Sequence, residues 1–349
     1  IIERIVSFMK RFPHLVPVLG AAILLAALCF IKPPGGSPAD VPIHRSDFLL
    51  NTFVDIAIYD SRDESILDGA MALCREYENR FSRTLSGSEV YRLNHREDAT
   101  GTYPLSDDMT DLLATALYYC ERSGGAFDIT TEPLSSLWNF SGTSPSVPPA
   151  EAIEEARKKV DYKKLRLDGT RSTLTFLDPG TSIDLGAIAK GYIADQLKAY
   201  LLDSGVESAM INLGGNVLCV GSRPDGTPFT VGLQKPFADR NETFAQVEVS
   251  DLSVVASGVY ERHFVEDGKN YHHILDPSTG YPYDNGLISV TILSERSVDG
   301  DALSTTCFSL GLSRGMELVE SMDGVYACFI DEDYQIHYSD GMEKFLRKD

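Results

Sequence analysis

Positive charge is scarce in this chain of 349 residues. It has 31 Lys and Arg against 51 Asp and Glu, which gives a formal net charge of −20 at pH 7. Proteins that bind nucleic acid without sequence preference need Lys and Arg to neutralise phosphates, so we expect no nucleic-acid partner. The acidic balance fits a soluble surface, and it also favours a site that takes up cations.

The common short site motifs are missing as well. Among the six cysteines there is no pair at C-x-x-C spacing, so neither a zinc ligand set nor a disulfide framework is expected. No Walker or dinucleotide fingerprint is present. Cys120, Cys219 and Cys328 stand within apolar runs and are predicted to be buried. With 43% hydrophobic residues, the chain can form a well-buried core, which excludes global disorder.

The N-terminal segment has the pattern of a membrane anchor. Arg4, Lys10 and Arg11 precede an uncharged stretch of 17 residues, 15–31, which is at the lower limit for spanning a bilayer. Positive charge on the leading side places the N-terminus in the cytoplasm and the remainder outside. We therefore predict an uncleaved signal-anchor at 1–32, a flexible linker at 33–43 and an extracytoplasmic catalytic domain at 44–349, attached to the cell membrane.

Two other interpretations of this segment stay open. The letters LAALC at 25–29 have the form of a lipoprotein cleavage box that ends at Cys29, although Leu28 stands where a small residue is expected. A cleaved secretory signal is the other possibility, but no clean small-x-small site follows the apolar run.

From about residue 44 the pattern mixes strands and helices without a long repeat. Frequent hairpin signals predict an α+β fold with mainly antiparallel sheets and packed helices. Helices are predicted at 63–80, from Ser106 to Gly124, at 151–160, 187–202 and 298–312. Strands are predicted at 48–60, in a pair around the Asp-Pro-Gly turn of 172–186, at 207–213, 217–221, 228–234, 244–250, 253–257, in a hairpin around Asp267-Gly268, and at 287–293, 324–330 and 334–338.

Two stretches could bind a phosphate and a cation. Asp301 and Thr305 stand at i and i+4 of the predicted helix 298–312, on one face, and their hard oxygens suit Mg²⁺. Asp184 precedes a helix whose first turn holds small residues and Lys190, an arrangement that suits phosphate. The alternatives are a dipole-favoured Asp with a Thr bonded back to its helix, and small residues that serve helix–sheet packing.

Two further stretches are ambiguous from their residues. In GAFDITTEPLSSLW (125–138) the glycines could bring the backbone close to a ligand, or could end a helix before a loop with core aromatics. In HHILDPSTGYPYDN (272–285), His272 and His273 point to opposite faces of a strand, which disfavours a zinc site with His263. One of the pair could face a cleft as a general base.

The order of these stretches resembles the ApbE family, the FAD:protein FMN transferases once called thiamine-biosynthesis lipoproteins. The resemblance covers essentially 45–345. It implies an ApbE-like, T-fold-like architecture and Mg²⁺-dependent transfer of FMN from FAD to a Thr or Ser of an extracytoplasmic acceptor, with release of AMP. Acceptors of this family are FMN-binding domains or redox-pump subunits. The stretches that carry the resemblance are FSRTLSGSEVYRLN, GAFDITTEPLSSLW, IDLGAIAKGYIADQL, INLGGNV, ASGVYERHF, YHHILDPSTGYP and DALSTTCFSLG.

The resemblance also implies roles for single residues. Asp301 and Thr305 match the side-chain magnesium ligands, and Ala187 would add its backbone carbonyl. His273 matches the family's histidine and is the candidate general base, with Asp301 the second catalytic residue. The residues assigned to the flavin nucleotide are Leu50, Thr84, Ala126, Phe127, Asp128, Asp184, Lys190 and Leu275.

At two positions the sequence affects whether these implied roles apply to this chain. Where the family begins with Met-Gly-Thr, this chain has Leu50-Asn51-Thr52, and Asn51 is bulkier than Gly. Thr84 falls at a varied position near the adenine end of FAD, which bears on transfer against hydrolysis. Two alternatives therefore remain open: an Mg²⁺-dependent FAD diphosphatase that gives FMN and AMP, and a flavin-binding lipoprotein without turnover.

Overall fold

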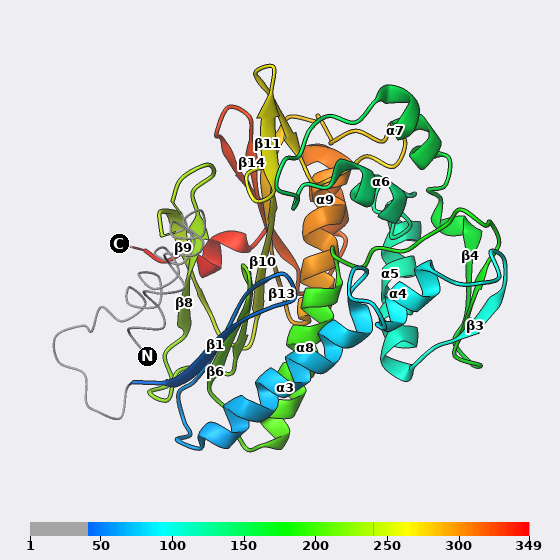
Figure 1. The fold of residues 1–349 in the computed structure, drawn as a ribbon. Helices are drawn as coiled ribbons and strands as arrows, with labels where there is room; N and C mark the ends of the chain where they lie inside the picture. The colour runs from blue at the N-terminus through cyan, green and yellow to red at the C-terminus, as the bar shows by residue number, and fades with distance from the viewer. Residues whose placement is uncertain (1–40, 240, 349) are drawn as a thin grey trace, which may run out of the picture. The chain divides into compact units, whose positions relative to one another are not determined.

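The structure of this protein is a computed structural model that describes residues 41–239 and 241–348 (Figure 1). Contacts group Ile43–Asp349 into one unit. The predicted anchor at 1–32 and Cys29 lie outside the described residues. Within those residues, no helix combines the length and the apolar character needed to cross a membrane.

The centre of the fold is an eight-stranded sheet in the order β1-β2-β6-β7-β10-β13-β14-β15, in which every neighbouring pair is antiparallel. This confirms the predicted α+β class with antiparallel pairing. Its strands are β1 (Ile43–Leu49), β2 (Thr52–Ile58), β6 (Ala209–Leu213), β7 (Asn216–Val220), β10 (Ser253–Gly258), β13 (Leu287–Ser294), β14 (Tyr326–Asp331) and β15 (Ile336–Tyr338).

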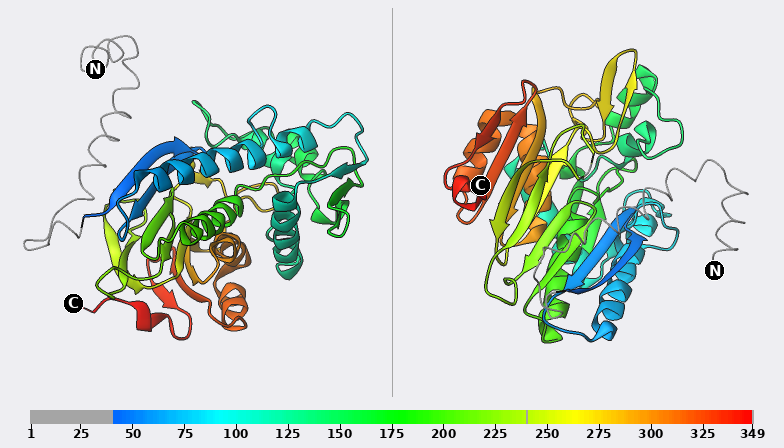
Figure 2. Two further views of the ribbon diagram at one scale, coloured as in Figure 1. Left: turned by 90° about the horizontal axis from the view of Figure 1, so that it is seen from below. Right: turned by 90° about the vertical axis from the view of Figure 1, so that its left-hand side faces the viewer.

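The central strands of this sheet are covered on both faces, so β13 is buried along its whole length, whereas the edge strand β1 alternates between exposed and partly buried residues. Helices α3 (Glu64–Phe81), α8 (Ala189–Asp203) and α9 (Ser297–Glu320) pack on one face, and the hairpin of β8 (Phe229–Gln234) and β9 (Thr243–Val249) covers part of the other (Figures 1 and 2). Neighbouring residues of one strand divide between the faces. Ile292, for example, belongs to the helix-side core and Leu293 to the hairpin-side core.

A second group of elements adjoins the ends of these helices. It contains the three-stranded sheet β3-β5-β4, a two-stranded hairpin and several short helices. Trp138 is the centre of its own small core, which also contains Leu134, Ile153 and Leu275. The elements are α4 (Glu89–Asn94), β3 (Thr102–Pro104), α5 (Asp107–Arg122), α6 (Glu132–Trp138), α7 (Ala150–Arg157), η3 (Tyr162–Lys164), β4 (Leu165–Asp168), β5 (Thr173–Phe176), β11 (His263–Glu266) and β12 (Lys269–His272). The C-terminal η4 (Met342–Phe345) instead packs in the core on the hairpin side of the central sheet.

Several local predictions are confirmed. Ser106 caps α5, since its side chain accepts a hydrogen bond from the N–H of Met109. β11 and β12 pair around Asp267-Gly268 as a hairpin. Cys120, Cys219 and Cys328 are buried free thiols.

The strand predicted at 48–60 is confirmed in part: β2 forms at Thr52–Ile58, but residues before it turn back into β1, and the two strands pair as a hairpin. Leu50 and Asn51 form its turn, and both have φ of 55°. A two-residue turn of this kind needs positive φ at both central positions, which Asn tolerates better than most residues. The apolar alternation continues on both sides of the turn, so periodicity alone did not reveal it.

The predicted pair of strands at 172–186 is half wrong, since only β5 forms. Residues 182–186 instead run as an irregular segment: Ile183 exchanges hydrogen bonds with the Asn94 side chain, and the N–H of Asp184 donates to the Ile129 carbonyl. The helix predicted at 298–312 continues to Glu320 past a kink at Gly311, where φ is 77°. Helix α6 forms in part of the stretch after Gly125 that was left open as a loop.

Candidate functional site

The first turns of α8 and α9 cross in contact, and this crossing brings two of the predicted stretches together. A Cβ on Gly191 would lie 2.3 Å from the carbonyl oxygen of Ser297, so only glycine allows this approach. Asp195 of α8 accepts hydrogen bonds from the N–H groups of Ser297 (2.8 Å) and Val298 (2.9 Å), and so satisfies free donors at the start of α9. Burial raises the pKa of Asp195 to about 6.

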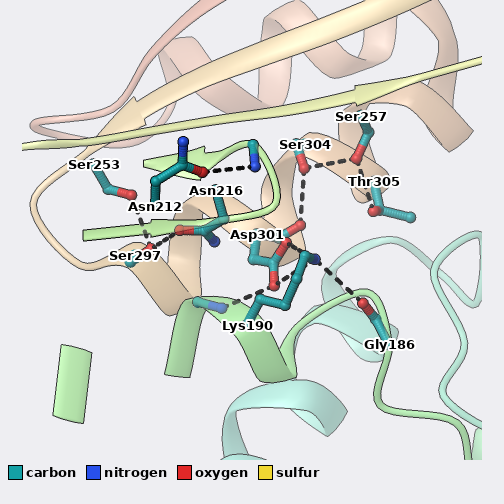
Figure 3. A network of polar contacts seen from close by, with 12 residues as sticks. Gly186, Lys190, Asn212, Asn216, Ser253, Ser257, Ser297, Asp301, Ser304 and Thr305 are labelled. Carbon is teal, nitrogen blue, oxygen red and sulfur yellow. Dashed lines mark hydrogen bonds and ion pairs between the residues drawn. The ribbon is translucent and has the colours of Figure 1, made fainter. Parts of the chain in front are cut away.

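Asp301 is the most enclosed acidic group at this crossing, with 4% of its surface exposed. Its Oδ2 accepts a hydrogen bond from the N–H of Gly191 at 2.9 Å, and its Oδ1 lies 3.1 Å from Nζ of Lys190 (Figure 3). The same Nζ lies 3.5 Å from the carbonyl oxygen of Gly186. The ammonium therefore lies between a buried carboxylate and the main chain just before Ala187.

Thr305 follows Asp301 by one helical turn, as its spacing predicted. Its Oγ1 lies 3.2 Å from Oγ of Ser257 on β10, and Ser257 is 2.8 Å from Oγ of Ser304. Ser304 in turn donates to the main-chain carbonyl of Asp301 at 2.9 Å. Ser257 was not singled out from the sequence, although ASGVYERHF, which contains it, was.

The start of α9 is also held to the sheet by a buried polar network (Figure 3). Ser297 donates from its hydroxyl to Oδ1 of Asn216 at 2.8 Å, and Ser253 donates to Ser297 at 2.9 Å. The Asn216 side chain comes from β7, in the INLGGNV stretch. This network and the Asp195 cap fix the position of the helix that carries Asp301.

The donor set at this crossing fits magnesium. A carboxylate (Asp301), a hydroxyl (Thr305) and the carbonyls around Ala187 are hard oxygen donors, and Mg²⁺ combines few such protein ligands with waters and substrate phosphate. In the structure a cation, the Lys190 ammonium, already bonds to the carboxylate and to one of these carbonyls. Within the described residues, no group of three or more His, Cys, Asp or Glu could hold a metal ion.

The two adjacent histidines have different environments. In His272, which is 4% exposed, Nε2 donates to the Tyr283 carbonyl at 2.9 Å and Nδ1 accepts from the N–H of Ile274 at 3.3 Å. Burial lowers the pKa of His272 to about 4. Both nitrogens are used, so His272 has a structural role.

In His273, by contrast, one ring nitrogen makes no hydrogen bond within the described residues. Its Nδ1 is buried and has no hydrogen-bond partner within the described residues, while its backbone N–H donates to the Arg262 carbonyl. Burial, together with the positive charges of Arg262, His272 and Lys190, lowers the pKa of His273 to about 3. The ring is therefore neutral at physiological pH and has an uncommitted nitrogen in the same electrostatic neighbourhood as Lys190.

The loop around Asp128 is held in place by hydrogen bonds to both oxygens of its carboxylate. Oδ1 of Asp128 accepts from the N–H and the hydroxyl of Thr130 at 2.7 and 2.6 Å, and Oδ2 accepts from the N–H of Tyr162 at 2.9 Å. Burial raises the pKa of Asp128. The hydroxyl of Tyr283 donates to the Ala126 carbonyl at 2.9 Å, and Phe127 is buried. The side chain of Asp128 therefore shapes the 126–128 backbone.

The other residues assigned to the flavin site lie in separate environments. Leu50 donates its N–H to the Glu78 carboxylate at 2.8 Å, Thr84 is exposed on the segment after α3, and Leu275 is buried in the small core around Trp138. Asp184 accepts from the N–H of Gly186 at 3.0 Å and pairs with Arg83 at 3.1 Å. The sequence did not predict a role for Arg83, because no local pattern identifies the partner of an arginine in a loop.

Comparisons with known proteins identify the family of this chain. The model of the ApbE family matches residues 50–330. A FAD:protein FMN transferase of Klebsiella pneumoniae is 37% identical over 83% of this chain and 90% of its own length, and one of Treponema pallidum is 32% identical over 93% and 94%.

Solved structures show the same likeness. The ApbE protein of Thermotoga maritima superposes with a TM-score of 0.80 at 32% identity, over 88% of this chain and all of its own. The flavin transferase ApbE of Vibrio cholerae superposes with a TM-score of 0.78 at 27% identity, over 87% and 99%. The chain belongs to the ApbE family.

Proposed function

We propose that this chain is an Mg²⁺-dependent transferase that moves FMN from FAD to a Thr or Ser side chain of an extracytoplasmic protein and releases AMP. The observation that carries the proposal is the cluster of Lys190, Asp301 and Thr305 at the crossing of α8 and α9. The carboxylate and the hydroxyl can bind the metal ion, and the ammonium can bind the negatively charged pyrophosphate. The relatives that carry the name FAD:protein FMN transferase support the same reaction.

In this reaction the acceptor hydroxyl attacks the phosphorus of the FMN half, and the bond from that phosphorus to the oxygen bridging to AMP breaks. Asp301, Thr305 and the Ala187 carbonyl would hold magnesium, which when bound supplies positive charge at the pyrophosphate. Lys190 contributes a further positive charge, as phosphoryl transfer depends mainly on positioning and charge stabilisation.

His273 is the proposed general base. Its neutral ring can accept the proton of the attacking hydroxyl at Nδ1, the nitrogen that has no other partner within the described residues. A pKa of about 3 keeps the ring of the free protein neutral at neutral pH, and it also makes the ring a weak base until a bound negative charge offsets the burial. The solved structures of the Vibrio cholerae flavin transferase include a histidine-to-glycine variant.

The flavin nucleotide would be held by Leu50, Thr84, Ala126, Phe127, Asp128, Asp184 and Leu275 around the same cluster. For Asp128 the contribution is through the shape of the 126–128 backbone, since its carboxylate is used within the loop. Arg83, which pairs with Asp184, would add a positive charge to this nucleotide site. We further propose that the chain acts outside the cell membrane, held by residues 1–32 or by lipidated Cys29.

An FAD diphosphatase uses the same groups with water in place of the acceptor hydroxyl, so one assay separates the two reactions. The purified chain is incubated with FAD, Mg²⁺ and a protein domain that carries a flavinylation Thr, and both in-gel flavin fluorescence and AMP are followed. Labelled acceptor supports transfer. AMP and FMN without label indicate the diphosphatase, and the absence of AMP and label excludes both enzymes and leaves a flavin-binding protein.

A further inference from the structure

The two oxygens of the Asp301 carboxylate are held by different kinds of donor. Oδ2 accepts a hydrogen bond from the main-chain N–H of Gly191 at 2.9 Å, whereas Nζ of Lys190, whose long side chain can rotate, lies 3.1 Å from Oδ1 and 3.5 Å from Oδ2. Asp195 differs, because both of its oxygens accept from main-chain N–H groups. The contacts from Lys190 can be released without moving a helix, whereas the contact from the Gly191 N–H cannot.

We propose that Lys190 is an exchangeable counter-cation for Asp301: the incoming metal displaces its ammonium from the carboxylate, and the freed ammonium then binds the pyrophosphate of FAD. This inference rests on the proposed metal site at Asp301 and Thr305. It adds an order of binding: the metal binds first, and the ammonium that it releases then becomes available to the pyrophosphate.

The contacts of Nζ explain why the two cations compete. The ammonium lies 3.1 Å from Oδ1 of Asp301 and 3.5 Å from the Gly186 carbonyl, next to Ala187. These are the kinds of oxygen that a magnesium ion needs. A carboxylate with 4% exposure requires a counter-charge, and the ammonium supplies one until the metal replaces it.

Lys190 also has a route away from the carboxylate. Its side chain is 27% exposed, against 5% for the side chain of Asp301, so the ammonium can leave toward solvent while the carboxylate stays. A phosphate bound beside the metal offers a new negative partner there. Metal and FAD should therefore strengthen each other's binding by the same factor, as linkage requires.

Lys198 is the matched control for this proposal. It lies on the same helix, its side chain is 19% exposed, and its Nζ pairs with Asp251 at 2.8 Å. It is thus a half-buried, ion-paired lysine on α8, but its partner takes no part in the proposed site.

The test measures the reactivity of the two lysines in the unmodified protein. The chain is acetylated with limiting reagent, with and without saturating Mg²⁺ and without FAD, and modification is quantified by mass spectrometry while calorimetry records metal binding. An amine released from a charged hydrogen-bond partner is more accessible to the reagent, by about tenfold for a typical charge-assisted bond. We expect Lys190 to react about tenfold faster in Mg²⁺ and Lys198 to stay unchanged.

A variant gives a second, independent readout. Lys190→Met should bind Mg²⁺ about tenfold more tightly, and at saturating Mg²⁺ it should bind ADP, a pyrophosphate that cannot donate FMN, about tenfold more weakly. Lys198→Met should change neither affinity. These opposite signs in one variant are the signature of exchange.

Each other result has a definite meaning. If Mg²⁺ binds by calorimetry but Lys190 reacts no faster, or if Lys190→Met leaves ADP affinity intact, the exchange is wrong and the metal site stands. If Mg²⁺ binds neither to the unmodified protein nor to Lys190→Met, the proposed metal site is wrong and the exchange is wrong with it, whatever the transfer assay shows.

Discussion

Two regions of this molecule, both assigned to the proposed flavin and metal site, satisfy their buried polar groups in opposite ways. Around Asp128, each acceptor is bound by a donor of fixed position, and His272, Tyr283 and Ala126 are linked in the same manner. At the crossing of α8 and α9, Asp301 depends on a flexible lysine, and nearby His273 keeps a nitrogen without a partner within the described residues.

This difference separates structural from chemical polar groups. A buried group whose partners are all fixed holds the backbone in place and is costly to alter. A buried group with a movable or missing partner costs stability in return for the ability to bind something else. The fixed region is therefore expected to respond to mutation in stability, and the helix crossing in turnover.

The largest effect is expected for Asp301→Ala. Loss of the charged metal ligand should remove about 4 kcal/mol of transition-state stabilisation, a fall of about a thousandfold in the rate of FMN transfer. The rate is measured as AMP release and acceptor fluorescence. Asp299→Asn is the control on the same helix, since Asp299 bonds to Tyr119 away from the cluster. Turnover by Asp301→Ala within threefold of the unaltered chain would remove the metal assignment.

Acid should destabilise the protein through the fixed region. The folded pKa of His272 is about 4 and its ordinary value is 6.5, so on acidification the unfolded chain takes up the proton first. The stability contributed by neutral His272 is complete above pH 6.5 and is lost as the pH falls to about 4, on the order of 3 kcal/mol. Urea unfolding from pH 7.5 to 4.5 measures it.

His272→Gln is the comparison for this pH effect. The difference between the two proteins isolates His272, because Asp195, whose raised pKa acts in the opposite direction, is present in both. A parallel pH dependence in the two proteins would show that His272 is not the group responsible.

For His273→Ala we expect a fall in kcat of about a hundredfold, the usual contribution of a general base, with FAD affinity nearly unchanged. Single-turnover transfer and FAD titration measure the two quantities. If the variant instead loses FAD binding, His273 belongs with the fixed region as a structural residue.

The smallest effect is expected for Asp128→Asn. The amide group can no longer accept from both the Thr130 and Tyr162 sides, which should lower the free energy of unfolding by about 2 kcal/mol. At a temperature where the variant is folded, kcat at saturating FAD should stay within a few-fold. Thr170→Ala, on the exposed turn between β4 and β5, is the control for stability. A thousandfold loss of kcat would place Asp128 in the chemistry.

The sequence predicted local features well and long-range partners poorly. The helical spacing of Asp301 and Thr305, the cap at Ser106 and the hairpin at Asp267-Gly268 depend on neighbours within a few residues, so periodicity and turn chemistry reveal them. The turn at Leu50-Asn51 was missed, because it interrupts a continuous alternation.

The pairing of Lys190 with Asp301 joins residues 111 positions apart, and no local pattern encodes it. The same holds for Arg83 with Asp184 and for Ser257 with Thr305. The different environments of His272 and His273 were also beyond the sequence, because they depend on which carbonyls the fold brings near each ring.

The most direct test of the central claim is the ratio of AMP released to acceptor labelled as magnesium is titrated. The purified chain, FAD and an acceptor domain are mixed at increasing Mg²⁺, with a chelator sample as the zero point. We predict one AMP for each flavinylated acceptor at every magnesium concentration, and neither product with chelator. AMP in large excess over label would contradict transfer, and label formed at full rate with chelator would contradict a metal at Asp301.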